Sequence, residues 1–205
     1  LDHRAGPLWA LVSRPGTEAL LRWQQRPPSV PPAPLSQAQA QSLAADGADV
    51  LIQLAGESLV SIEADSGVCS LWDATSLLAV DGEAGCSVQR VLGPGSYRIM
   101  VRPFAGRPTS GKLVWTAQNL RRLGEGVGMQ EWAAPGETRA FRFSTQAAGK
   151  LGLGLRAESD VLQCAVYDAE QRLLGRGCHQ FLDLPKGDFL LRVSVPAAAE
   201  PMRFR

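Results

Sequence analysis

The four cysteines are the residues whose spacing defines their chemistry most clearly. They form two pairs, Cys69 with Cys86 (86 − 69 = 17) and Cys164 with Cys178 (178 − 164 = 14). Each pair occupies the same place in a stretch of sequence that occurs twice, so we expect one disulfide bond in each repeat. Four buried free thiols in a reducing compartment are the alternative. Disulfide bonds would indicate an oxidising compartment.

Residues that could support catalysis are scarce. A serine nucleophile needs a base, and the two histidines are His3, close to the first residue, and His179, directly after a cysteine. The sequence has no Gly-x-Ser-x-Gly, His-Glu-x-x-His or Ser-x-x-Lys motif. A zinc site made of Cys164, Cys178 and His179 would lack a fourth ligand, and adjacent strand residues point to opposite faces. We therefore expect no enzymatic activity, no zinc and no cofactor.

Two pairs of aspartates offer oxygen ligands of the kind that calcium prefers. Asp65 precedes Asp73 by eight residues, and Asp160 precedes Asp168 by the same interval. Along an extended strand such a pair is about 26 Å apart at ~3.3 Å per residue, so its members meet only if the chain bends between them. We expect aspartates that cap turns, and no metal site.

The cysteines and aspartates belong to a unit of sequence that occurs twice. Residues 69–74, Cys-Ser-Leu-Trp-Asp-Ala, return as residues 164–169, Cys-Ala-Val-Tyr-Asp-Ala, with an offset of 95 (164 − 69 = 95). The second cysteines are offset by 92 (178 − 86 = 92), so one intervening loop is three residues shorter. A shared offset that changes only within a loop is typical of duplicated domains.

Trp72 and Tyr167 occupy equivalent positions at the end of a predicted strand. Because side chains alternate along a strand, they lie on the face opposite to Cys69 and Cys164. If the cysteines face the core, the two aromatic rings point outward, where they could pack on a protein or stack on a sugar. The alternative is that they cover the junction between the repeats or are buried by a loop.

The pattern of strands predicts an all-β fold. Each repeat has several short apolar stretches separated by turn signals every ~8 to 12 residues, without helical periodicity, which favours an antiparallel β-sandwich. In the first repeat we expect residues 97–102 and 112–116 to pair as a terminal hairpin. At about 70 residues a repeat would bury only about 60% of its unfolded surface. An internal disulfide worth roughly 3 kcal/mol would then matter for stability.

The chain divides into five segments. Residues 1–26 match only the second half of a repeat and should form a β-hairpin; since an isolated hairpin is marginal, an upstream segment, a later repeat or another chain must complete it. Residues 27–44 begin with a proline-rich stretch and should form a stiff linker, or a ligand for a proline-binding domain. The repeats occupy residues 45–117 and 135–205, and residues 118–134 link them. Without an initial Met or a signal peptide, the chain should be a processed or excised piece.

Composition and charge argue against nucleic-acid binding and against a transmembrane helix. With 45% hydrophobic residues the chain can form packed cores. Its 21 Lys and Arg residues balance 20 Asp and Glu residues, and no basic block is present that would attract nucleic acid. No apolar run approaches the roughly 20 residues that a transmembrane helix needs.

Residues 65–79 with 93–101, and residues 160–175 with 185–193, resemble the bacterial pre-peptidase C-terminal domain. The shared features are an acidic residue before a strand, an aromatic residue and Asp at its end, and Pro-Gly-Tyr or Lys-Gly-Phe in front of a strand with Arg and Val, in a loose motif that covers about two thirds of each repeat. The resemblance implies small jelly-roll-like β-sandwiches that act as non-catalytic accessory or substrate-binding modules of secreted bacterial enzymes. The repeated disulfide is not part of the family pattern, and no catalytic domain accompanies the repeats here.

Together these features predict tandem, disulfide-bonded β-sandwiches that form a non-catalytic binding module in the bacterial periplasm or outside the cell. A protein partner is favoured. A carbohydrate- or peptidoglycan-binding accessory domain is the first alternative, and a structural spacer, suggested by the proline-rich segment, is the second.

Overall fold

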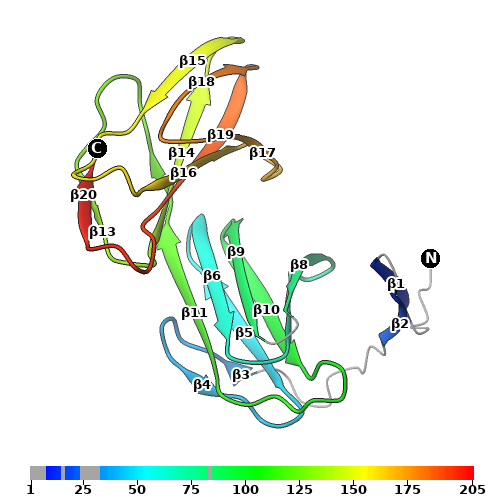
Figure 1. Ribbon diagram of the computed structural model, residues 1–205. Helices are drawn as coiled ribbons and strands as arrows, with labels where there is room; N and C mark the ends of the chain where they lie inside the picture. Colours follow the sequence, from blue (N-terminus) through cyan, green and yellow to red (C-terminus); the bar gives the residue numbers. More distant parts are fainter. Residues whose placement is uncertain (1–7, 15–16, 24–32, 83–84) are drawn as a thin grey trace. The chain divides into compact units, whose positions relative to one another are not determined.

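All elements in the part of the chain that the structure describes are β-strands (Figure 1). This computed structural model describes residues 8–14, 17–23, 33–82 and 85–205. The described residues contain no helix that is long and apolar enough to cross a membrane. The chain divides into a unit of residues 1–33 and a unit of residues 34–205. The all-β fold class is confirmed.

The first unit contains two strands. β1 (Leu8–Arg14) and β2 (Thr17–Trp23) pair antiparallel, from Leu8 opposite Trp23 to Arg14 opposite Thr17. The rest of the hairpin expected over residues 1–26, and residues 27–32 of the proline-rich segment, lie outside the described residues.

The first repeat is a sandwich of two sheets. One sheet has the strand order β3-β5-β10-β7-β8 and the other has the order β4-β11-β6-β9. The strands are β3 (Ala33–Pro34), β4 (Gln41–Ser42), β5 (Ala48–Leu54), β6 (Ser58–Ala64), β7 (Val68–Trp72), β8 (Leu77–Asp81), β9 (Cys86–Leu92), β10 (Gly95–Arg102) and β11 (Lys112–Asn119).

The second repeat has the same strand order. Its five-stranded sheet runs β12-β14-β19-β16-β17, and the pairs β13-β20 and β15-β18 take the place of the four-stranded sheet, so that each label is nine higher than its counterpart. The strands are β12 (Arg121–Arg122), β13 (Glu131–Ala133), β14 (Thr138–Thr145), β15 (Gly149–Gly154), β16 (Gln163–Tyr167), β17 (Leu173–Arg176), β18 (His179–Leu184), β19 (Gly187–Ser194) and β20 (Met202–Phe204).

The register of the strands is repeated as well. Val101 lies opposite Cys69 in the first repeat, and Val193 lies opposite Cys164 in the second. A register shift occurs directly before Trp72 where β7 pairs with β8, and directly before Tyr167 where β16 pairs with β17. Such irregularities are retained within families of related domains, so the two repeats are copies of one fold.

Each repeat has its own apolar core between its sheets. Alternate residues of β5 and β10 are buried in the first core, among them Val50 and Ile99, because successive side chains of a strand point to opposite faces. Val166 and Val193 occupy the second core. Each fully buried aliphatic side chain contributes roughly 1.5–3 kcal/mol.

The two disulfides join the sheets across these cores, as the spacing predicted. Cys69 of β7 is bonded to Cys86 of β9 in the opposite sheet, with Cα atoms 5.8 Å apart. Cys164 of β16 is bonded to Cys178, which directly precedes β18, with Cα atoms 5.0 Å apart. Both bonds lie within a repeat, so each sandwich is cross-linked internally.

The expected terminal hairpin of residues 97–102 and 112–116 is wrong. β10 lies between β5 and β7 in the five-stranded sheet, while β11 pairs with β4 and β6 in the other sheet. β10 has no free edge left for β11, because both of its edges already carry a ladder of hydrogen bonds. The last two strands of the second repeat, β19 and β20, separate in the same way.

Both segments predicted as linkers contribute to the sandwiches. Leu35 and Leu43, from residues 27–44, are buried in the first core, and β3 and β4 add strands to its two sheets. Leu35 also accepts a 3.1 Å hydrogen bond from Nε1 of Trp115. Residues 118–134 supply β12 and β13. These short edge strands were hidden in the sequence because Pro and Gln dominate around β3 and β4, and Gly is frequent between β12 and β13.

Candidate interaction surface

The two repeats meet at an apolar junction in which outward-facing residues of one repeat cover those of the other. Leu59 of β6 points away from the first core because its neighbour Val60 is buried inside it. Leu59 packs with Ala140 of β14 and Leu190 of β19, both on the outer side of the second repeat. Three partly buried residues complete this cluster: Val91, Leu120 and Tyr167.

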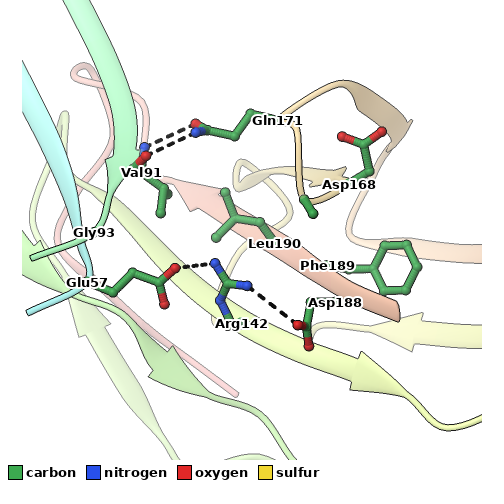
Figure 2. Close-up of a pocket in the computed structure, with 10 residues that line it drawn as sticks. Glu57, Val91, Gly93, Arg142, Asp168, Gln171, Asp188, Phe189 and Leu190 are labelled. Atoms are coloured by element: carbon green, nitrogen blue, oxygen red, sulfur yellow. Dashed lines mark hydrogen bonds and ion pairs between the residues drawn. The ribbon is translucent and has the colours of Figure 1, made fainter. Parts of the chain in front are cut away.

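Polar contacts fix the position of the two repeats in the junction (Figure 2). The side-chain amide of Gln171 donates a 3.0 Å hydrogen bond to the carbonyl oxygen of Val91, and its oxygen accepts one of 3.0 Å from the Val91 N–H. Arg142 forms an ion pair with Glu57 of the first repeat, and Asp188 lies 3.9 Å from the same guanidinium. The Gln171 side chain of the second repeat thus satisfies both backbone groups of Val91 in the first repeat.

Arg192 holds the Gln171 side chain and an aromatic ring together. It donates a 3.0 Å hydrogen bond to Oε1 of Gln171, and its guanidinium carbon lies 4.6 Å from the centre of the Tyr167 ring. Burial lowers the pKa of Arg192, and the charge of Arg90 acts in the same direction, whereas Tyr167 raises it. A cation–π contact of this kind contributes about 0.5–2 kcal/mol.

A shallow cavity of about 160 Å³ lies beside the junction. Its polar lining includes Glu57, Arg142 and Asp188, which are engaged with one another. It is smaller than the ~300–1,000 Å³ of typical small-molecule sites. The described residues contain no group of three or more His, Cys, Asp or Glu side chains that could hold a metal ion.

The predicted turn-capping role fits Asp73 and Asp168, whereas Asp65 accepts a 2.8 Å hydrogen bond from the N–H of Lys112, which is far away in the sequence. Oδ1 of Asp73 accepts hydrogen bonds from the backbone N–H groups of Thr75 (2.7 Å) and Ser76 (2.6 Å), and these bonds lower its pKa. Asp168 accepts the N–H of Arg172 at 2.8 Å in the corresponding turn. Of the two histidines, His179 is exposed on β18, and His3 lies outside the described residues.

Trp72 and Tyr167 have equivalent positions but different surroundings. Tyr167 packs into the junction, as the alternative interpretation of these aromatics expected. Trp72 is half-buried on the outer side of β7, where its Nε1 donates a 2.9 Å hydrogen bond to Oγ of Ser70. The aromatic position is therefore covered by protein in the second repeat and lies outside the junction in the first.

The outer side of the first five-stranded sheet, which we name the open face, carries apolar side chains beside the ion pairs of Asp49 with Arg98 and Arg102. Leu51, Trp72 and Met100 are half-buried there, and their counterparts Arg142, Tyr167 and Arg192 lie in the junction. Leu77 and Val80 of β8 flank the face with exposures of 47% and 52%. Sequence reasoning missed Leu77 and Val80, although the run of residues 77–80 on a strand next to Trp72 was the available signal.

Comparison with known proteins assigns no family to the chain. No family model matches it, and no curated protein sequence matches it. A solved structure of a glycosyl hydrolase family 2 member from Bacteroides cellulosilyticus aligns with a TM-score of 0.26 and 11% identity, over 72% of this chain and 22% of that protein.

Two further solved structures are similar at the same level. A second family 2 member, from Bacteroides cellulosilyticus DSM 14838, gives a TM-score of 0.28 and 13% identity over 72% of this chain and 23% of that one. The CUB1-EGF-CUB2 region of human MASP-1/3 gives 0.25 and 7% over 82% and 98%. This chain spans less than a quarter of the two hydrolases, and similarity at these TM-scores assigns no function.

Proposed function

We propose that this chain is a non-enzymatic module that binds a protein partner through the open face of its first repeat. The observation that supports this function is the difference between the repeats. In the second repeat, the outer side of the five-stranded sheet is covered by protein, because the first repeat packs on Ala140, Leu190 and Tyr167. In the first repeat the equivalent side carries Trp72 and Met100, with exposed Leu77 beside them.

The chemistry of the open face favours a protein over a glycan. Met and Leu side chains supply adaptable apolar contacts, and clusters of exposed apolar residues mark protein interaction sites. The Trp72 N–H is already bonded to Ser70, so the indole offers its apolar surface and no free donor for a sugar hydroxyl. The side chain opposite Trp72 in the ladder, Arg98, is hydrogen-bonded to Asp49, so the polar groups beside the ring are also engaged within the face.

The two disulfides support a location outside the reducing cytoplasm. We further propose that the protein is periplasmic or secreted in a bacterium and that each repeat is a sandwich like the pre-peptidase C-terminal domain. The repeated Asp-capped turn after the aromatic residue, seen at Asp73 and Asp168, is consistent with that resemblance.

The test is partner capture by the intact chain and by a variant of the open face. Leu77→Ser with Val80→Thr changes two exposed side chains on an edge strand, so folding should be retained. Val127→Ser with Met129→Ser is the matched control, since both residues are exposed in a loop of the second repeat. We expect the first variant to lose a protein that the intact chain captures from secreted and envelope fractions of the source organism, and the control to retain it. Equal capture by both variants, or capture of glycan alone, would refute the proposal.

A further inference from the structure

We propose that the partner is a second molecule of this chain, bound head to tail. In this arrangement the outer side of β15 and β18 in one molecule, which we name the free face, docks on the open face of the next molecule. This contact between molecules has the same arrangement as the junction between the two repeats within one molecule. This inference rests on the proposed function, because it names the partner of the same open face.

The free face is the counterpart of the surface that the first repeat uses in the junction. β15 and β18 correspond to β6 and β9, and the register of each pair is the same: Gly152 lies opposite Phe181 where Ser61 lies opposite Gln89. Phe181 is 86% exposed. Its ring lies over Gly152, where an added Cβ would come within 3.0 Å of a ring carbon. The free face therefore presents a large aromatic surface with nothing in the described residues to cover it.

The first argument for the pairing is complementary size. In the junction, Gln89 of the first repeat reaches Oγ1 of Thr138 in the second at 3.5 Å. On the free face the counterpart of Gln89 is the larger Phe181 (181 − 89 = 92), and on the open face the counterpart of Thr138 is Gly47 (138 − 47 = 91). A bulky side chain on one face thus meets a position without a side chain on the other. The turn itself also requires a glycine there, because Gly47 has a φ of 107° and an added Cβ would collide with the carbonyl oxygen of Val101.

The second argument is complementary charge at the centre. The four apolar junction residues that meet there all have charged counterparts. On the free face these are Lys150 and Asp183, which lie opposite each other in the ladder, and on the open face they are Asp49 and Arg98, which are hydrogen-bonded. The free face carries one positive and one negative group, and the open face carries Asp49 with two arginines, Arg98 and Arg102. Docking can therefore pair Lys150 with Asp49 and Asp183 with an arginine. The corresponding junction residues are, in the same order, Leu59, Val91, Ala140 and Leu190.

The third argument is that, at the margin, a charged pair in the junction corresponds to apolar residues on the two free surfaces. Glu57 and Arg142 form an ion pair across the junction. Their counterparts are Ala148 on the free side (148 − 57 = 91) and Leu51 on the open face (142 − 51 = 91), both apolar. At the margin, the charged pair of the junction thus corresponds to apolar residues on both the free side and the open face. At the centre, the apolar residues of the junction correspond to charged residues on both faces. Paired exchange on two separate surfaces is expected if these surfaces meet.

Such a contact joins two different surfaces, so it leaves one face free at each end and allows chains of molecules to grow. It lacks a counterpart of the Gln171 clamp, because the turn after Trp72 carries Thr75 and Ser76 in that region. It also lacks the high effective concentration of an intramolecular contact. We therefore expect reversible association that is weaker than the junction.

Two variants that exchange residues between the repeats test the contact. Phe181→Gln gives the free face the residue of the first repeat, and Leu51→Arg gives the open face the residue of the second. Both side chains lie on outer sides of the sheets, away from the buried cores. Sedimentation at about 10 µM to 1 mM, a range suited to weak contacts, should show the intact chain rising above its monomer mass of 21.9 kDa. Each variant alone should stay monomeric, and a mixture of the two should form a one-to-one dimer. Adding Ala148→Glu to Leu51→Arg should restore association by recreating the ion pair.

An intact chain that stays monomeric over this range would overturn the inference, as would variants that associate like the intact chain. Failure of the mixture to dimerise would also overturn it, because each variant retains the face that the other has lost. The proposed function is judged separately. If the intact chain is monomeric but Leu77→Ser with Val80→Thr still abolishes capture of a different protein, the function stands and the self-association is refuted.

Discussion

The disulfide in each repeat should contribute a large share of the stability of that repeat. Replacing both Cys69 and Cys86 by Ala removes a bond that closes a loop of 17 residues. Because that loop restricts the unfolded chain, the chain-entropy model predicts a loss of about 3 kcal/mol in the free energy of unfolding. The loop between Cys164 and Cys178, with a separation of 14, gives nearly the same value, lower by about 0.2 kcal/mol.

Urea unfolding measures this loss for the first repeat. Trp115 is buried in the first core. In a background with Trp9, Trp23 and Trp132 replaced by Phe, the remaining tryptophans, Trp72 and Trp115, both belong to the first repeat, so the change of fluorescence on unfolding reports on that repeat. For a domain of this size a loss of about 3 kcal/mol corresponds to a fall of roughly 12–24 °C in the melting temperature. The double variant of the second pair, Cys164→Ala with Cys178→Ala, is the matched control, and its effect should fall mainly on the second repeat. The reduced wild-type chain, which lacks both bonds, should show both losses.

The reasoning would be refuted if removal of Cys69 and Cys86 cost less than about 1 kcal/mol, since the bond would then constrain little of the unfolded chain. A wild-type chain with titratable thiols under denaturing conditions would contradict the disulfides themselves.

Three further outcomes follow from the junction and the turns. A double-mutant cycle with Glu57→Gln and Arg142→Gln should give a coupling energy of about 0.5–1 kcal/mol, because the two side chains are 37% and 23% exposed; a value near zero would show that the pair does not fix the junction. Gln171→Ala should lower the hydrogen-exchange protection of the Val91 amide relative to amides in both cores, since it removes the acceptor of that N–H; unchanged protection would count against the clamp. Backbone N–H bonds lower the pKa of Asp73 below its ordinary 3.8, so its contribution to stability is present above the unfolded pKa and is lost as pH falls through the folded pKa; an NMR titration of Asp73 with a midpoint at or above 3.8 would exclude this.

Local patterns of the sequence predicted the strands, the duplication and the disulfides. Alternation along residues 68–72 places Cys69 and Leu71 in the core, and both are fully buried. The offsets that related the two sequences also relate the two sets of strands and their registers. These features are local, or they compare one segment with its copy, so no knowledge of distant pairing was needed.

Non-local pairing could not be predicted in the same way. The pattern of residues 97–102 and 112–116 is that of two strands, but it carries no signal that they belong to opposite sheets. The different surroundings of Trp72 and Tyr167 depend on contacts with the other repeat, notably Leu59, which is far away in the sequence. The aligned pairs Asp49 with Ala140 and Arg98 with Leu190 held part of that information, because one face is charged where the other is apolar.

Photo-crosslinking from the open face tests the central claim most directly. A photoreactive phenylalanine analogue in place of Met100, half-buried at the centre of the face, should form a crosslink with protein, and the crosslinked peptide should come from residues 148–154 or 179–184 of a second molecule. The same analogue at Val127, an exposed loop position of the second repeat, should give no specific product. The account would be contradicted if position 100 gave no protein crosslink, or gave only the products that position 127 also gives.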